Sequence, residues 1–157
     1  MAIAHTLESY ITRRGIPYEV ISHAHSHSSA ETAELAHVPG DRLAKSVILE
    51  DDAGFVMAVL PSTYHVRLGR LSRELNRSRL RLTPEKMLPD LFEDCEVGAI
   101  PPVGLAYGLS TIVDIDIADQ PEIYFEAGDH EKLIRMNRED FRALMDHSAR
   151  ARFASRM

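Results

Sequence analysis

Residues 45–61 read KSVILEDDAGFVMAVLP and contain two apolar runs, rich in β-branched residues, on either side of a short polar segment. Runs of this length and composition are typical of β-strands. The polar segment from Glu50 to Gly54 is acidic and ends in glycine, which favours a tight connection between the two runs. The pattern therefore predicts an antiparallel hairpin with strands at residues 45–49 and 55–60.

Helical and extended patterns alternate along the rest of the chain. Capping residues and apolar side chains at helical spacing predict helices that begin at Thr6, Ser28, Val66, Thr83 and Asn137. Apolar runs between turn residues predict further strands at 17–21, 78–82, 111–117, 122–126 and 133–136. We therefore expect an α+β fold, a compact single domain in which helices surround a mixed, mostly antiparallel sheet.

The composition is that of a globular domain, since 45% of the 157 residues are apolar and 27% are charged. We expect residues 1–157 to form one domain, with a core over about 16–145 and a basic, frayed tail at 149–157. Cys95 is the only cysteine, which excludes an internal disulfide and favours a reducing cytoplasm. No signal-peptide pattern is found, nor any stretch near the roughly 18 apolar residues that a membrane span requires. We therefore expect a cytoplasmic protein with no membrane partner.

The charge is unevenly distributed. The chain carries a net charge of −6, yet residues 65–86 contain seven basic side chains against two acidic ones. Leucines at helical spacing in this stretch predict a helix with arginines on its opposite face, namely Arg70, Arg73 and Arg77. Such a face either contacts the phosphates of a nucleic acid or is simply solvated.

Common catalytic motifs are absent, including the Walker loop, the dinucleotide glycine fingerprint and the nucleophile elbow. His23, His25 and His27 alternate at strand spacing and could offer imidazoles to a metal ion, but no nearby acid or cysteine completes a ligand set. We therefore favour loop or capping roles for them and predict no metal and no cofactor. Acidic neighbours disfavour the thiolate of Cys95, which we interpret as a packed thiol.

Two further motifs join the hairpin: CEVGAIPPVG at residues 95–104 and YFEAGDH at residues 124–130. Their order and spacing behind Lys45 resemble the YbaK-like aminoacyl-tRNA deacylases, relatives of the editing insertion domain of bacterial prolyl-tRNA synthetase. The resemblance spans roughly residues 16–145. It implies a domain that hydrolyses the ester between a wrong amino acid and tRNA, acting in trans. Mischarged tRNA would be its partner and an aminoacyl-tRNA synthetase a further one.

The resemblance also implies the site residues. Lys45, Gly98 and His130 would be catalytic. Substrate would be bound by residues that flank these, namely Ala99, Ile100, Pro101, Pro102, Ala127 and Gly128. Backbone N–H groups of Gly98 and Ala99 would stabilise the oxyanion, Lys45 would hold a phosphate or the oxyanion, and His130 would position substrate or relay a proton. No protein nucleophile is evident, so water is the expected attacking group.

Glu126 departs from the family pattern, in which a small or neutral polar residue is expected. Its carboxylate could select a substrate amine, act as a base or repel nucleic acid. Two other functions also remain open for the chain: a non-catalytic module that binds tRNA or a synthetase, and a hydrolase of small esters or thioesters unrelated to tRNA.

Overall fold

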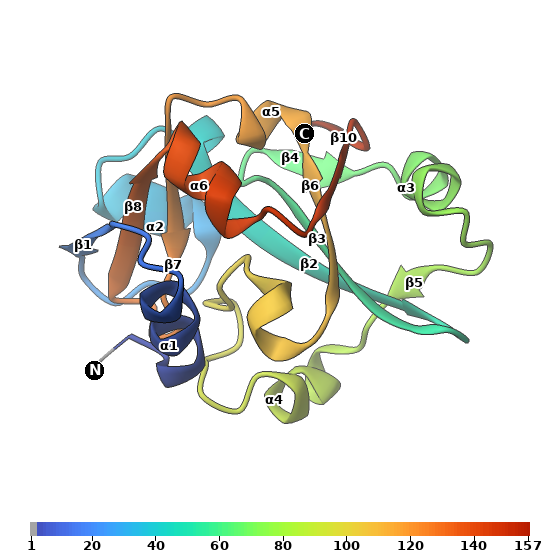
Figure 1. The fold of residues 1–157 in the computed structure, drawn as a ribbon, viewed down its shortest axis with the longest axis horizontal. Helices are drawn as coiled ribbons and strands as arrows, with labels where there is room; N and C mark the ends of the chain where they lie inside the picture. The colour runs from blue at the N-terminus through green and yellow to red at the C-terminus, as the bar shows by residue number, and fades with distance from the viewer. Residues whose placement is uncertain (1–2) are drawn as a thin grey trace.

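The computed structural model describes residues 3–157 and contains an eight-stranded mixed sheet with helices packed around it (Figure 1). The sheet has the strand order β1-β8-β7-β2-β3-β6-β9, and β5 pairs with β2 outside this order. A two-stranded sheet joins β4 to β10. The strands are β1 (Glu19–Ser22), β2 (Leu43–Asp51), β3 (Gly54–Pro61), β4 (Tyr64–Val66), β5 (Arg81–Leu82), β6 (Ser110–Asp114), β7 (Glu122–Glu126), β8 (Lys132–Asn137), β9 (Ala149–Ala151) and β10 (Ala154–Arg156).

The helices are short. They are α1 (His5–Arg13), α2 (Ser29–Leu35), α3 (Leu68–Leu75), α4 (Leu88–Leu91), α5 (Ile115–Ala118) and α6 (Arg138–Leu144), with 3₁₀ turns η1 (Gly40–Arg42), η2 (Glu85–Met87) and η3 (Gly104–Tyr107). None of the helices within residues 3–157 is long and apolar enough to cross a membrane.

The predicted hairpin is confirmed as β2 and β3, which pair antiparallel with Lys45 opposite Leu60. Antiparallel pairing also joins β1 to β8, β8 to β7 and β5 to β2, whereas β2–β7, β3–β6 and β6–β9 are parallel. The expected α+β fold with a mixed, mostly antiparallel sheet is therefore correct.

Side chains of β3 alternate between two buried clusters on opposite faces of the sheet. Met57 and Val59 pack with residues of α1 and α6, whereas Val56 and Ala58 pack with Leu71 of α3. Helix α3 consequently lies apart from the other helices, at the upper right of the view, above the β2–β3 hairpin (Figure 1). This arrangement leaves the end of β2 that carries Lys45 beside α2 and the loop before η3.

The prediction of a frayed tail at residues 149–157 is wrong. Residues 149–156 form β9, parallel to β6, and β10, antiparallel to β4. Phe153 between them is fully buried, and the Asp114 carboxylate accepts hydrogen bonds from the backbone N–H groups of Phe153 and Ala154 at 3.0 and 2.9 Å. Buried backbone donors need such partners, so this segment is part of the fold.

Other differences arise at element ends. Ala4, not Thr6, occupies the N-cap position of α1 and makes no side-chain cap, and Asp94 from a distant loop instead accepts the Thr6 N–H at 2.8 Å. The predicted strand at 111–117 stops at Asp114, whose side chain caps α5 instead. The helix expected after Thr83 is reduced to η2 and the four-residue α4.

Candidate functional site

A cavity of about 220 Å³ opens between β2, the start of α2 and the loop at residues 97–100. Its walls come from separate parts of the chain, and they are Ser28, Ser29, Ala44, Lys45, Ser46, Ile48, Glu85, Leu88, Val97, Gly98, Ile100 and Glu126. The Ser46 hydroxyl donates to the Ile100 carbonyl at 3.1 Å. This bond fixes the loop against β2, so the cavity is held by the hairpin itself.

Lys45 supplies an unneutralised positive charge to this cavity. Its side chain is half-buried, and Nζ donates to the Ser62 carbonyl oxygen at 3.3 Å. No carboxylate within residues 3–157 forms an ion pair with it. Burial lowers the pKa of the Lys45 ammonium because the charged form loses hydration. A cation in this position favours an anionic partner from outside the chain.

The loop backbone presents one of the two predicted oxyanion donors. The Ala99 N–H is already bonded to the Glu96 carbonyl at 3.0 Å, and Ala99 is fully buried. The Gly98 N–H has no hydrogen-bond partner among the described residues. Gly98 has φ +88°, a conformation that L side chains rarely adopt. Of the predicted pair, only Gly98 therefore has a donor to offer.

Of the other predicted substrate-binding residues, Ile100 lies in the cavity wall. Pro101 and Pro102 are buried outside the cavity lining. The Ala127 carbonyl accepts from Ala4, and the Gly128 carbonyl accepts from Glu96 at 2.8 Å. These two residues connect the β7–β8 turn to its neighbours without touching the cavity.

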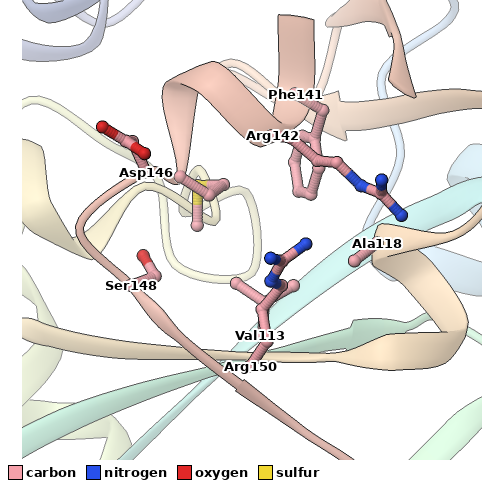
Figure 2. A pocket seen from close by; sticks show the side chains of 8 residues that line it. Val113, Ala118, Phe141, Arg142, Asp146, Ser148 and Arg150 are labelled. Atoms are coloured by element: carbon pink, nitrogen blue, oxygen red, sulfur yellow. The ribbon is translucent and has the colours of Figure 1, made fainter. Parts of the chain in front are cut away.

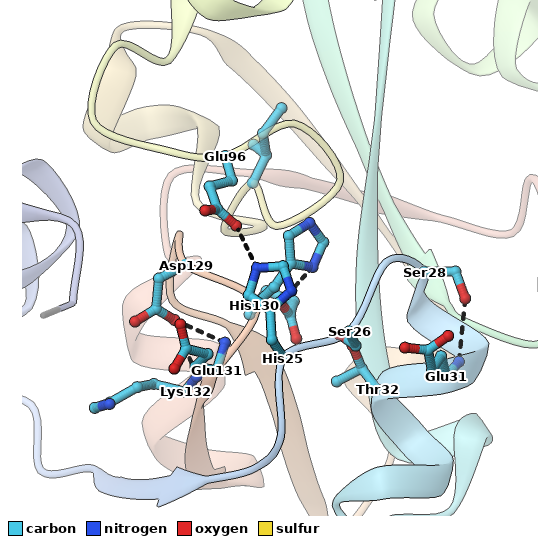
Figure 3. Close-up of polar contacts among 12 residues, drawn as sticks. His25, Ser26, Ser28, Glu31, Thr32, Glu96, Asp129, His130, Glu131 and Lys132 are labelled. Carbon is cyan, nitrogen blue, oxygen red and sulfur yellow. Dashed lines mark hydrogen bonds and ion pairs between the residues drawn. The ribbon is translucent and has the colours of Figure 1, made fainter. Parts of the chain in front are cut away.

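His130 supports the loop from behind. It is buried with φ +61°, and its Nε2 lies 2.8 Å from the Val97 carbonyl oxygen. A Cβ added at Gly98 would lie 3.2 Å from the His130 ring, which leaves room for glycine alone without a shift. Figure 3 shows His130 under this loop, beside the hydrogen bond between His25 Nε2 and the Glu96 carboxyl group at 3.1 Å.

Glu126 reaches the cavity wall from the end of β7 and is buried between two histidines. Its carboxylate oxygens lie 3.5 Å from His23 Nε2 and 3.5 Å from His130 Nδ1. Burial, with the nearby charge of Asp129, raises the pKa of Glu126 to about 7. The sequence predicts only a loop or capping role for His23, because the spacing of the histidines gives no sign of a contact made across 103 residues.

The profile of the aminoacyl-tRNA editing domain family matches residues 23–144 of the sequence. The chain belongs to this family. The matched segment contains Lys45, the Gly98 loop and the His130 turn. All residues that line the cavity lie within this segment.

Solved structures with similar folds are also found. A hypothetical protein superposes with a TM-score of 0.85 at 20% identity, covering 96% of this chain and 100% of that one. A protein provisionally described as a trans-editing enzyme for prolyl-tRNA synthetase gives a TM-score of 0.83 at 20% identity, with 97% and 96% covered. At these identities the likeness shows the fold. A search of curated protein sequences finds no match.

The predicted arginine face of the editing domain is smaller than expected. Helix α3 ends at Leu75 because Asn76 adopts the left-handed conformation, so Arg77 leaves the helix. Arg77 instead clamps the hairpin turn, with Nε 2.7 Å from Asp51 Oδ2 and a second bond to the Gly54 carbonyl at 2.7 Å. This ion pair lowers the pKa of Asp51 to about 2. Two exposed arginines, Arg70 and Arg73, remain on α3.

Two other features lie outside the candidate site of the editing domain. A second cavity of about 220 Å³ (Figure 2) contains none of the predicted residues and is lined by Val113, Ala118, Phe141, Arg142, Met145, Asp146, Ser148 and Arg150. Cys95 contacts the Tyr107 hydroxyl at 3.2 Å, and burial raises the pKa of its thiol to about 12. The interpretation of Cys95 as a packed thiol is therefore correct. Within residues 3–157, no three histidine, cysteine or acidic side chains are arranged so that they could hold a metal ion.

Proposed function

We propose that the protein is an aminoacyl-tRNA deacylase that hydrolyses the ester bond of mischarged tRNA in trans. The observation that carries the proposal is the pairing, in one cavity wall, of the half-buried Lys45 ammonium with the unpaired N–H of Gly98. Ester hydrolysis by water develops negative charge on the carbonyl oxygen, and pre-oriented donors stabilise that charge. Membership of the editing-domain family supports this reaction. We infer that it accompanies translation in the cytoplasm.

Lys45 and Gly98 have different roles in the proposed reaction. Gly98 donates its N–H to the developing oxyanion, while Lys45 holds either that oxyanion or the terminal adenosine phosphate. Water is the nucleophile, because no serine or cysteine in the cavity wall has an adjacent base in hydrogen-bond contact. The reaction needs no cofactor under this proposal.

Cavity size supports a small aminoacyl group. A volume of about 220 Å³ lies below the roughly 300 to 1,000 Å³ typical of pockets for drug-sized ligands. A synthetase distinguishes small apolar side chains by only about 1 to 3 kcal/mol, so errors among them need a separate hydrolytic step. We propose that the substrate carries such a small side chain.

Exposed arginines on α3 support contact with the tRNA. Replacing Arg70 and Arg73 together with alanine should raise KM and reduce the salt dependence of binding by about two phosphate contacts. The matched control is Arg13→Ala with Arg142→Ala, which removes the same charge from α1 and α6. Turnover unchanged by the α3 pair would favour a small ester or thioester as the substrate.

The reaction is tested by deacylation of alanyl-, cysteinyl-, seryl- and threonyl-tRNA with chelator present. Release of one or two amino acids at a rate that depends on Lys45 is expected. The alternative, a non-catalytic module for tRNA or a synthetase, predicts measurable tRNA binding without release from any member of the panel.

A further inference from the structure

Four buried polar atoms beside the cavity face one another without hydrogen-bond partners among the described residues. They belong to three side chains, and they are His23 Nε2, Glu126 Oε1, Glu126 Oε2 and His130 Nδ1. The carboxylate stands between the two rings, 3.5 Å from a nitrogen of each. The His23, Glu126 and His130 side chains are 0 to 6% exposed. Unpaired polar atoms at this depth are costly, so the arrangement needs an explanation.

The other nitrogen of each ring determines which hydrogens the histidines carry. His23 Nδ1 lies 2.7 Å from the Ala24 carbonyl oxygen, and His130 Nε2 lies 2.8 Å from that of Val97. Carbonyl oxygens only accept, so both of these nitrogens carry hydrogen. A neutral imidazole has only one N–H. The nitrogens that face Glu126 therefore carry none when the rings are neutral.

An ionised Glu126 between two neutral rings would place carboxylate lone pairs against the lone pair of each facing ring nitrogen. One added hydrogen, either on the carboxyl group or on a ring nitrogen, creates a hydrogen bond at once. We propose that His23, Glu126 and His130 share at least one proton at neutral pH, and that this proton fixes the ring of His130 beneath the Gly98 loop. Glu126 is then a positioning residue, which acts on the cavity through His130.

The charges around the cluster are consistent with a retained proton. Asp129 and Glu96 disfavour ionisation of Glu126, while His25 favours it. The Thr32 hydroxyl, which also contacts Ser26 at 2.5 Å, lies against the carboxyl group and favours its ionised form, which lowers the pKa of Glu126. Burial is the largest effect and raises the pKa of Glu126 to about 7, so the carboxyl group retains its proton far more readily than in water.

The consequence for the cavity follows from the contacts of His130. Its Nε2–H holds the Val97 carbonyl, and its ring packs against the position of a Gly98 Cβ. A change in the tautomer or tilt of the ring would release this carbonyl. The unpaired Gly98 N–H, which belongs to the next residue, would then lose its fixed direction.

The direct test is ¹⁵N NMR of the full chain with labelled histidines between pH 5.5 and 8.5. In wild type, His130 Nε2 should keep its hydrogen throughout, and the resonances of His130 Nδ1 and His23 Nε2 should move with one common midpoint. Glu126→Gln should abolish that common midpoint, whereas Glu139→Gln, at an exposed position of α6, should leave it unchanged. Independent titration of the two rings, unaltered by Glu126→Gln, would overturn the proposal.

An activity measurement tests whether the shared proton acts on the Gly98 loop through His130. This measurement rests on the proposed function. Glu126→Leu has no hydrogen to share and should lower kcat for deacylation about tenfold, equivalent to one hydrogen bond of about 1.4 kcal/mol. Glu126→Gln can donate to one ring and should restore most of this loss. The ratio of the wild-type kcat to that of Glu126→Gln should fall as pH rises through the common midpoint.

The NMR titration and the activity measurement test the shared proton and the proposed function separately. A common midpoint without any deacylation would support the shared proton and refute the proposed function. Deacylation with independently titrating rings would support the proposed function and refute the shared proton. Equal kcat for Glu126→Leu and wild type at all pH values would refute the positioning role, and if Glu126→Leu does not fold, the pH dependence of the Glu126→Gln ratio decides.

Discussion

Replacement of Glu126 by glutamine should make the protein more stable at alkaline pH and leave it nearly unchanged at acidic pH. Burial raises the pKa of Glu126 from 4.5 to about 7 in the folded protein. The folded state therefore binds this proton more tightly than the unfolded state does. The resulting stability is fully present below pH 4.5 and is lost as pH rises through 7. Between pH 5 and 8 this loss amounts to about 2 to 3 kcal/mol, and glutamine, which does not ionise, avoids it.

Urea unfolding followed by circular dichroism at pH 5, 6, 7 and 8 measures this difference, since the chain has no tryptophan. At pH 8 the Glu126→Gln protein should have the higher unfolding free energy, with a Tm higher by roughly 5 to 10 °C. Contributions from titrating groups outside the cluster of His23, Glu126 and His130 are common to both proteins and largely cancel. Glu139→Gln on α6 is the matched control and should follow wild type. Parallel wild-type and Glu126→Gln stabilities from pH 5 to 8 would refute a buried carboxyl group with a raised pKa.

Three further substitutions test separate parts of the structure. Gly98→Ala, at φ +88° and with 3.2 Å to the His130 ring, should cost about 1 to 3 kcal/mol in thermal unfolding and reduce deacylation in a chain that still folds; wild-type activity would contradict the role of the loop. Arg77→Ala should lower Tm but leave the salt dependence of tRNA binding unchanged, because Arg77 is bound to Asp51; a weaker salt dependence would place it at the RNA surface. Phe153→Ala should cost about 3 to 5 kcal/mol in urea unfolding, since its side chain is fully buried; a loss below 1 kcal/mol would restore the interpretation of a frayed tail.

Local patterns predicted those elements whose partners are near in sequence. Ser28 accepts from the Glu31 N–H at 3.1 Å and Asn137 from the Asp140 N–H at 2.8 Å, as expected of capping residues. The tail at 149–157 could not be recognised as strands, because its pairing depends on β6 and β4, which lie far along the chain. Short strands of this kind gain their stability from partners rather than from their own residues.

In the candidate site, too, residues in local motifs were predicted, whereas contacts between distant segments were not. Lys45 and Gly98 belong to motifs within single segments, and both line one cavity. The Ala99 N–H was expected to be free, but its bond to Glu96 depends on a turn that composition does not reveal. The role of Glu126 depends on His23, which meets it only because β1 pairs with β8.

Single-turnover deacylation of the four aminoacyl-tRNAs by wild type and Lys45→Ala tests the proposed reaction most directly. Lys86→Ala serves as control, because Lys86 is exposed in η2 and absent from the cavity wall. Loss of a group that stabilises an oxyanion typically lowers the rate by about 100-fold or more. We predict such a loss for Lys45→Ala with an unchanged circular dichroism spectrum, and less than about a twofold change for Lys86→Ala. A folded Lys45→Ala protein that releases amino acids at the wild-type rate would contradict the proposed mechanism.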